Sequence, residues 1–373
     1  MDECHSHRRM REVLDASDLD AVVAISPENV FYLSDALILT QRYIPDRLAV
    51  VIWSKGRAPT MIVCAIEESL ARQDSSIPDI RTYIEFQTSP VAVLADVLAE
   101  HGVARGRIGY ERGVWTLDGY TELLDRVPGA TWVPAERQFD LARMIKGEEE
   151  QRHLAHAARS TDAAIDTAFT RAAIGWSEKG IGDVIQAEML AAGADYSPFL
   201  VLAAGENTKR VHHFPNADPM PAGGIVHFDG GGFWHGYYSD LARTAVVGRA
   251  TEAQRDIYAR LWAIQQEIID SVRVGRRVSD VYAIGKRAFA QHAVPFAMTL
   301  LGHSLGFVLH EYPIINGVTD EVILPGMMFC VEPSCTAADG GRYHIEDLVR
   351  VTKRGPDVVS RAREWSHLPV IGG

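Results

Sequence analysis

The first 146 residues alternate short apolar runs with stretches of helical period. Four runs rich in β-branched residues predict strands, because such side chains pack well on a pleated sheet. Apolar residues three or four positions apart in residues 91–103 and 117–127 predict two helices. This alternation is typical of an α/β domain. The predicted strands are residues 19–25, 47–53, 58–63 and 107–111.

The pattern changes within residues 141–169, a long helix-forming stretch rich in Ala, Glu and Arg. We place the domain boundary at Gly147, which gives domains of residues 1–146 and 147–373. In the second domain we expect helices over one face of a largely antiparallel sheet, an α+β arrangement. Its predicted helices are residues 148–173, 178–193, 251–272 and 278–292, and its predicted strands are residues 199–205, 224–231, 236–248, 327–333 and 343–352.

The composition and charge of the chain limit the partners and cellular locations that we expect for it. A hydrophobic content of 47% and a charged content of 23% are ordinary for a globular protein. The net charge of −12 argues against nucleic acid or an anionic membrane as the main partner, because both favour a basic surface. The polar N-terminus lacks the apolar core of a secretory signal, so we expect a cytoplasmic protein. The four scattered cysteines predict reduced thiols.

Two aspartates flank a predicted hairpin in the second domain. Asp229 and Asp240 are equally distant from the point between Trp234 and His235, so a turn there would set them opposite one another. Directly opposed Cβ atoms lie only ~4.5–5.5 Å apart, and like charges so placed destabilise a sheet. Asp229 follows the apolar run GIVHF, and a buried carboxylate without a partner is strongly unfavourable. The pair predicts a protonated acid or a bound cation.

A second hairpin repeats this arrangement. Glu332 and Glu346 are symmetric about the turn residues 338–341. Either pair alone could be exposed acids on a solvated face, but Glu332 also follows an apolar run, MMFCV. His303 and His310 lie close to each other in the sequence, within the glycine-containing stretch of residues 301–313. Two divalent ions would neutralise four carboxylates, and these donors with an imidazole suit Mn²⁺, Co²⁺, Fe²⁺ or Zn²⁺. Such a pair of ions activates water and clamps a carbonyl oxygen.

These motifs resemble the pita-bread metallohydrolases, the family of methionine aminopeptidase, Xaa-Pro aminopeptidase and prolidase, with creatinase as a metal-free relative. SPENVFYLSDA (residues 26–36) resembles the prolidase-type N-terminal domain, and RMIKGEEE (residues 143–150) resembles the junction before the catalytic domain. The resemblance implies a pita-bread catalytic domain behind a smaller α/β domain, two divalent ions with Mn²⁺ favoured, and a homodimer. The metal ligands that it implies are Asp229, Asp240, His303 in GHSLG, Glu332 in PGMMFCVEP and Glu346 in HIEDLV.

The resemblance also implies catalytic roles. His212, in AAGENTKRVHHFPN, matches a histidine that faces the substrate, and His310 of HEYP matches one that hydrogen-bonds the substrate carbonyl or the tetrahedral intermediate. Imidazoles so placed donate to a developing oxyanion. Glu332 is the expected proton shuttle. The candidate substrate-binding residues are His213, Arg342 and His344.

The sequence departs from the family pattern near the last ligand. Prolidases and Xaa-Pro aminopeptidases usually have arginine where this chain has His344, and the forked arginine suits carboxylates in a way that histidine does not reproduce. Arg342 would point to the same face of a regular strand and replace it in part. Ala242 stands where threonine is usual, and Ser304 where glycine is usual. These departures leave every ligand in place but question the specificity for proline dipeptides.

We therefore expect a dinuclear metallopeptidase that cleaves the bond after an N-terminal residue followed by proline, as an Xaa-Pro dipeptidase or aminopeptidase. The first alternative is a non-peptidase enzyme on the same fold that acts on a small amide or osmolyte, resembling creatinase, ectoine hydrolase or a sulfonium lyase, because a fold does not fix a substrate. The second is a catalytically silent binding module, against which the five intact ligands argue. The expected partner is a small peptide or small amide.

Overall fold

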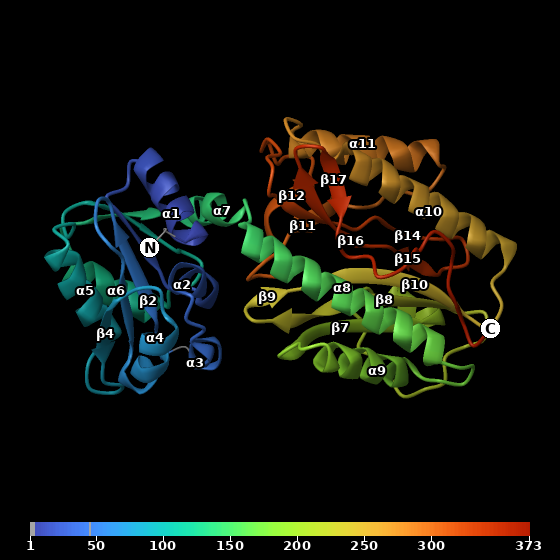
Figure 1. Cartoon of the computed structure of the whole chain (residues 1–373), viewed down its shortest axis with the longest axis horizontal. Helices are drawn as coiled ribbons and strands as arrows, with labels where there is room; N and C mark the ends of the chain where they lie inside the picture. Colours follow the sequence, from blue (N-terminus) through green and yellow to red (C-terminus); the bar gives the residue numbers. More distant parts are fainter. Residues whose placement is uncertain (1–3, 45) are drawn as a thin grey trace. The chain divides into compact units, whose positions relative to one another are not determined.

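The protein divides into two compact units in the computed structural model, which describes residues 4–44 and 46–373. The first unit ends at Arg143 and the second begins at Met144, a few residues before the predicted boundary. Figure 1 shows the first unit in blue to teal and the second in green to red. Each unit has a sheet and helices of its own, so each is described by itself.

The described residues of the first unit form a mixed sheet in the order β4-β3-β2-β1-β5-β6. The four inner strands are those that the sequence predicts, whereas both edge strands were missed. Edge strands face solvent on one side, so β4 and β6 are only partly buried and have a weak apolar pattern. The strands are β1 (Ala21–Ala24), β2 (Val50–Ser54), β3 (Thr60–Cys64), β4 (Asp79–Tyr83), β5 (Arg107–Tyr110) and β6 (Thr131–Pro134).

Helices pack beside this sheet and complete the α/β unit. Val91, Leu94, Val97 and Leu98 of one predicted helix lie in a common apolar cluster with β1, β2 and β3. The two predicted helices are present as α5 and α6. The helices of the unit are α1 (His5–Ala16), α2 (Pro27–Ser34), α3 (Leu39–Tyr43), the 3₁₀ turn η1 (Ala65–Glu67), α4 (Glu68–Asp74), α5 (Pro90–Glu100), α6 (Leu117–Arg126) and α7 (Glu136–Arg143).

The second unit contains two larger sheets and a short ribbon, β14-β15, rather than the single predicted sheet. One sheet has the order β18-β10-β8-β7 with β9 paired to β8, and the other has the order β12-β11-β13-β16-β17. The strands are β7 (Tyr196–Ala204), β8 (Ile225–Trp234), β9 (Tyr237–Tyr238), β10 (Leu241–Val247), β11 (Leu300–Ser304), β12 (Glu311–Asn316), β13 (Met328–Val331), β14 (Ser334–Thr336), β15 (Arg342–His344), β16 (Asp347–Thr352), β17 (Gly355–Val358) and β18 (Val370–Ile371).

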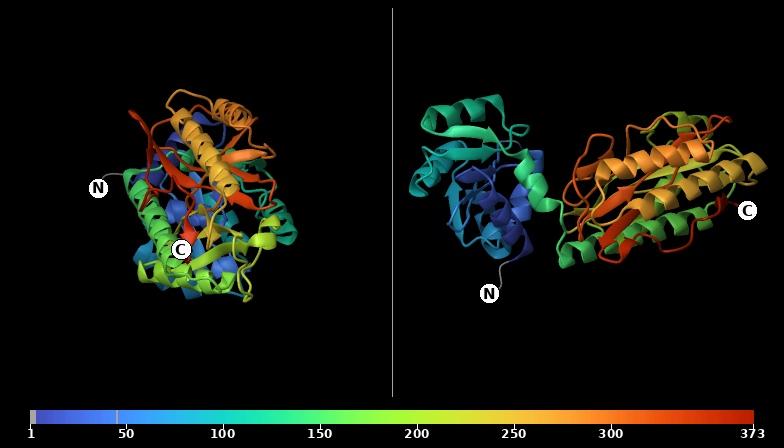
Figure 2. Two further views of the ribbon diagram at one scale, coloured as in Figure 1. Left: turned by 90° about the vertical axis from the view of Figure 1, so that its right-hand side faces the viewer. Right: turned by 90° about the horizontal axis from the view of Figure 1, so that it is seen from above.

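Each of these sheets has its own pair of helices. Residues of α8 and α9 share a buried apolar cluster with β7, β8 and β10, and α10 and α11 contact β13, β11 and β12. Figure 1 shows the two pairs on opposite sides of the strands, and Figure 2 shows the unit from its end and from above. The α+β class is confirmed. The bounds are α8 (Glu148–Arg171), α9 (Glu178–Ala191), the 3₁₀ turn η2 (Gly205–Lys209), α10 (Glu252–Ser271) and α11 (Val278–Gln291).

Sequence signals explain where two of these helices begin. Helix α8 begins after Gly147, whose N–H donates to the Glu150 carboxylate at 2.7 Å. At α10 the Thr251 hydroxyl accepts the Gln254 N–H, and the Gln254 side chain accepts the Thr251 N–H. These reciprocal bonds satisfy backbone donors that a helix leaves unpaired at its first turn.

A buried ionic network joins the two larger sheets of the second unit. Arg243 on β10 donates to Asp162 of α8 at 2.8 Å and to Asp347 of β16 at 2.9 Å, and all three side chains are fully buried. The same guanidinium donates to the backbone carbonyl of Glu346. The network therefore holds β10 and β16 together beside residues that the sequence predicts as metal ligands.

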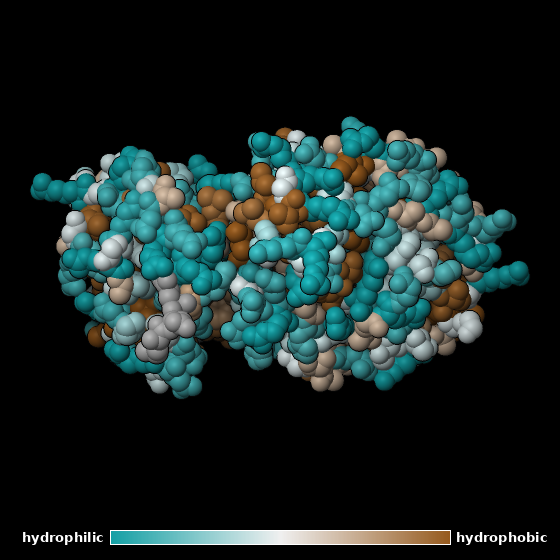
Figure 3. Space-filling view, turned by 45° about the horizontal axis from the view of Figure 1, so that its top comes forward, coloured by the Kyte–Doolittle hydropathy of each residue, from teal (hydrophilic) through white to brown (hydrophobic). Residues whose placement is uncertain are grey.

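The surface drawn in Figure 3 is largely hydrophilic, with hydrophobic residues gathered in scattered patches. Among residues 4–44 and 46–373, none of the helices combines the length and the hydropathy of a membrane span. The four cysteines, Cys4, Cys64, Cys330 and Cys335, are free thiols, as predicted.

Candidate metal centre

The hairpin that carries the two aspartates turns one residue later than predicted. Strand β8 pairs with β9 through Trp234 and Tyr237, which leaves His235 and Gly236 as a two-residue loop. Both loop residues have positive φ, 48° and 94°, as a tight turn that follows the twist of its strands requires. The register therefore differs by two residues from the one expected from a turn between Trp234 and His235.

This shift corrects the predicted pairing of Asp229 with Asp240. Asp229 lies opposite Ala242, and Ser239 bonds to Gly232, so Asp240 lies beside Gly231. A Cβ on Gly231 would stand 1.8 Å from the Ser239 carbonyl oxygen, so only glycine permits this approach. The aspartates are diagonal neighbours on one face of the sheet, and their carboxylates still converge within 4.8 Å of each other and of Glu346.

The predicted opposition of the two glutamates agrees with the register on both sides of them. Val331 pairs with Asp347 in the ladder of β13 and β16, and Ser334 pairs with His344 in the ribbon of β14 and β15. Both ladders keep the same register, so Glu332 and Glu346 face one another in the gap between them. The Glu346 N–H donates to the carbonyl of Ala242 at 3.0 Å, which fixes this glutamate beside the aspartate hairpin.

His303 reaches the carboxylates from β11. Its Nδ1 lies 3.0 Å from the backbone carbonyl of Ser304, which accepts only if Nδ1 carries the proton. Its Nε2 then presents a lone pair 3.4 Å from Glu332 and 3.8 Å from Asp240. Burial lowers the pKa of His303 to about 4, which keeps the ring neutral and able to ligate a metal. The exposed ring of His310 stacks on this one with centroids 3.7 Å apart.

The electrostatics of the cluster fit a cation. Burial, reinforced by Asp229 and Glu332, raises the pKa of Asp240 well above its usual range, and burial with Asp240 and Glu332 does the same to the pKa of Glu346. One oxygen each of Asp240, Glu332 and Glu346 is buried without a hydrogen-bond partner. A divalent ion would supply those missing partners and favour the charged carboxylates. The residues present therefore fit a metal centre.

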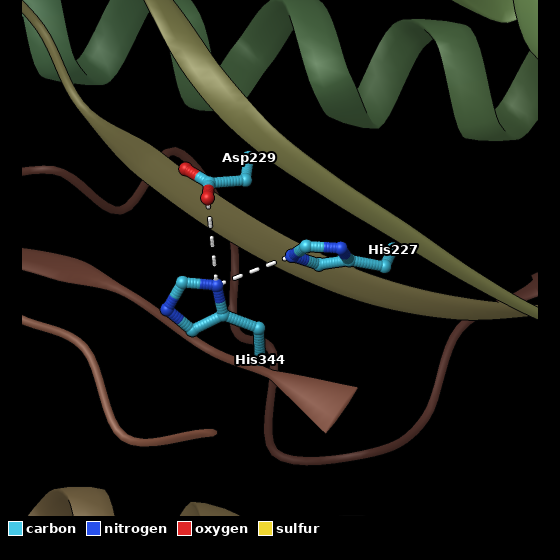
Figure 4. Close-up of side chains that lie close together, drawn as sticks. All are labelled: His227, Asp229 and His344. Atoms are coloured by element: carbon cyan, nitrogen blue, oxygen red, sulfur yellow. Dashed lines mark hydrogen bonds and ion pairs between the residues drawn. The ribbon is translucent and has the colours of Figure 1, made fainter. Parts of the chain in front are cut away.

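Two further histidines adjoin this cluster. His344 lies with Nδ1 3.8 Å from Asp229 and Nε2 3.5 Å from Glu332. His227 is fully buried, and its Nε2 lies 3.2 Å from His344 Nδ1 (Figure 4). Sequence analysis assigned His227 no catalytic, substrate-binding or metal-binding role, although a signal was available: it precedes Asp229 by two positions on the same strand face. Cys330 is also close, but burial raises the pKa of its thiol well above the usual range, so it stays protonated.

The remaining predicted site residues fall into two groups. His212 is exposed and, like Arg342, lies near enough to Asp229 to oppose the rise that burial causes in the pKa of that carboxyl. His213 does not join the cluster: its Nε2 lies 3.0 Å from Glu178, whose carboxylate also accepts N–H groups of the same loop. This partly buried contact gives His213 a place in holding the loop, and its contact with substrate stays a prediction.

Arg342 is the predicted partial substitute for the usual arginine. It lies on β15 two residues before His344, and its Nη2 donates to the Ser334 hydroxyl at 3.0 Å. Its Nε is buried without a hydrogen-bond partner. The other two departures leave the ligands undisturbed: the backbone of Ala242 bonds to Glu346, and that of Ser304 bonds to His303.

Comparison with known proteins identifies the family. Residues 152–353 match metallopeptidase family M24, and residues 7–145 match the creatinase/prolidase N-terminal domain. The first match covers more than half of the chain. The chain belongs to metallopeptidase family M24. Its membership implies divalent metal ions, and it confirms the resemblance and the two-part architecture predicted from the sequence.

This M24 metallopeptidase is similar to proteins named for proline-containing substrates. It is 24% identical over 352 residues to the Xaa-Pro dipeptidase of Pyrococcus horikoshii, covering 93% of this chain and 94% of that protein. The solved prolidase from Pyrococcus horikoshii OT3 has the same fold, with a TM-score of 0.83, 22% identity and coverage of 97% of this chain and 99% of the other. The X-Pro aminopeptidase from Thermotoga maritima MSB8 also shares the fold, with a TM-score of 0.83, 17% identity and coverage of 96% and 100%.

Proposed function

We propose that this protein is a dinuclear metallopeptidase that cleaves the amide bond between an N-terminal residue and proline. One observation carries the proposal: four carboxylates and the Nε2 of His303 converge in a chain that aligns over nearly its whole length with an Xaa-Pro dipeptidase. The proposed ligands are Asp229, Asp240, His303, Glu332 and Glu346. Their oxygen-rich donor set favours a hard ion, for which we propose Mn²⁺.

Three residues of the chain, Glu332, His310 and His212, have separate roles in this reaction. When bound, two divalent ions supply Lewis-acid chemistry by polarising the scissile carbonyl and lowering the pKa of water. Glu332 accepts a proton from the attacking water and returns it to the proline nitrogen, which makes that nitrogen a leaving group. His310, exposed and stacked on His303, donates a hydrogen bond to the oxyanion that develops on the substrate. The exposed His212 faces the substrate on the Asp229 side.

A substrate screen tests this function. The purified protein would be assayed with Xaa-Pro dipeptides, longer Xaa-Pro peptides and non-peptide amides after addition of Mn²⁺, Co²⁺ or Zn²⁺. We expect hydrolysis of at least one Xaa-Pro substrate and its loss on chelation. Turnover of a small amide with none of any Xaa-Pro peptide would favour the alternative function on this fold. His344 in place of the usual arginine is the observation that supports that alternative.

The homodimer and the cytoplasmic location stay predictions.

Replacing His310 by Ala should lower kcat while metal content stays unchanged. Removing one donor to an oxyanion typically lowers the rate by about 10²–10³-fold. Metal analysis and steady-state kinetics of the purified variant would check this. The matched control is His292→Ala, because His292 is a histidine of the second unit whose Nε2 lies 2.7 Å from Glu267 and which is not among the proposed site residues. Loss of metal from His310→Ala, with activity restored by excess ion, would make His310 a ligand instead.

Replacing Arg342 by Gln should weaken binding of Xaa-Pro dipeptides. The partly unpaired guanidinium is the expected partner of the substrate carboxylate, and a hydrogen bond to a charged group contributes about 1.5–3 kcal/mol, or roughly 10–100-fold in KM. The same Xaa-Pro sequence with an amidated C-terminus is the matched substrate, since it lacks that carboxylate. Equal losses on both substrates would exclude this role for Arg342.

A further inference from the structure

His227 is a buried polar group that the proposed reaction does not use. Its side chain is inaccessible to solvent on β8, and its hydrogen-bond partner is another imidazole rather than a carboxylate, so the uncharged ring is the favoured form. A neutral imidazole has one N–H donor and one acceptor nitrogen. Figure 4 shows the ring pointing toward His344, which lies between His227 and Asp229. The question is which nitrogen of each ring carries the proton.

The hydrogen-bond partners of His227 indicate which of its nitrogens carries the proton. Its Nδ1 is buried without a partner, whereas its Nε2 lies 3.2 Å from His344 Nδ1. A buried donor without an acceptor is strongly unfavourable, and an unpaired acceptor nitrogen is less so. The proton of His227 therefore belongs on Nε2, from which it is donated to His344. The Nδ1 of His344 must then be the acceptor, so the proton of His344 lies on Nε2.

That Nε2 faces the proposed proton shuttle. It is buried without a hydrogen-bond partner, but the carboxylate oxygen Oε2 of Glu332 lies 3.5 Å away, slightly beyond ordinary hydrogen-bond length, so a proton there has an acceptor close by. Contacts of this kind are often long in an empty active site and shorten when the reacting groups are in place. The backbone of His344 is fixed as well, because the Thr244 hydroxyl accepts its N–H at 2.9 Å and donates to its carbonyl at 2.8 Å. His344 is thus held at both its backbone and its ring.

We propose that His227 is a positioning residue that sets the tautomer of His344, so that His344 donates through Nε2 to Glu332 and orients that carboxylate. The role assigned to Glu332 rests on the proposed function, whereas the proton positions on the two rings do not. Partners that fix a histidine tautomer beside a metal centre typically change metal affinity or activity by about 10–100-fold when replaced.

Two other arrangements of these groups are less favourable. If His344 ligated a metal through Nε2, its proton would lie on Nδ1 and point at His227, which would leave a buried N–H on His227 Nδ1 without an acceptor. A further cation between His227, Asp229 and His344 would lie close to the charged Arg342, which already acts on Asp229. Two divalent ions balance the four carboxylates, so another cation would add uncompensated charge.

The test compares two substitutions. His227→Leu removes the donor to His344, whereas His227→Gln places an amide N–H near the same point. We expect kcat of the Leu variant to fall by about 10–100-fold with KM and metal content unchanged, and the Gln variant to recover most of the loss. Wild-type kcat in His227→Leu, or an equal loss in both variants, would overturn the proposal.

Nuclear magnetic resonance gives a readout that does not depend on turnover. Histidine-selective ¹⁵N labelling and long-range ¹H–¹⁵N spectra of the Zn²⁺-loaded protein would report the tautomer of each ring, with His344→Gln and His227→Gln used for assignment. We expect both rings to be protonated at Nε2. A proton on Nδ1 of His344, or a shift showing that its Nε2 binds Zn²⁺, would overturn the proposal even if a variant fails to fold. A wild-type protein that cleaves no Xaa-Pro substrate would instead overturn the proposed function and leave the tautomer assignment standing.

Discussion

Replacing Asp240 by Asn, or Glu346 by Gln, should abolish hydrolysis and lower the metal content of the purified protein. Each change removes one negative charge from a cluster whose buried oxygens lack other partners. Each also replaces an oxygen with an amide nitrogen, which offers a metal no comparable ligand. If two ions share these carboxylates, as we propose, losing one ligand would disturb both ions. We expect a loss of turnover beyond that of His310→Ala, measured by elemental analysis alongside kinetics.

The control for these variants is a carboxylate of the same unit outside the cluster. Asp183 on α9 is exposed and pairs with Lys179 at 2.6 Å, so Asp183→Asn should keep full metal content and activity. Near-normal turnover and unchanged metal stoichiometry in both Asp240→Asn and Glu346→Gln would refute the dinuclear assignment.

Replacing Arg243 by Leu should destabilise the second unit more than any surface substitution. The change leaves Asp162 and Asp347 fully buried without their shared cation, and removing one partner of a buried ion pair typically lowers the free energy of unfolding by about 3–5 kcal/mol. It also removes the donor to the Glu346 carbonyl, so the metal site should lose a support. Thermal and urea unfolding, followed by tryptophan fluorescence, would measure the effect.

Arg363 provides a matched control. Both arginines lie over the ring of Trp365, at 5.1 Å for Arg243 and 4.6 Å for Arg363, but Arg363 is partly exposed and pairs with Asp166 near the surface. Exposed ion pairs typically contribute about 0–1 kcal/mol, so Arg363→Leu should change stability little. Equal stability losses in the two variants would show that the contact with Trp365, and not the buried charge network, supports this region.

Sequence patterns were most reliable where the structure depends on neighbouring residues. Helices α8 to α11 begin and end close to their predicted bounds, because apolar period and capping are properties of one segment. The opposition of Glu332 and Glu346 was predictable for the same reason, since one local turn sets the register of both flanking ladders. Strands β11 and β12 were missed: their pairing contains register shifts, which break the regular alternation that marks a strand.

The sequence by itself determined the family, the two-part architecture and the identity of the five proposed ligands, because residue types and local spacing encode all three. Only the tertiary structure decided how those ligands meet. The positive φ of His235 and Gly236 moved the hairpin turn by one residue and made Asp229 and Asp240 diagonal neighbours. The contact of His227 with His344 joins residues that are 117 positions apart in the sequence. The Arg243 network joins three separate elements, α8, β10 and β16. Such contacts arise from the packing of whole sheets, and no local pattern of hydrophobic and polar residues specifies which buried side chains will face one another.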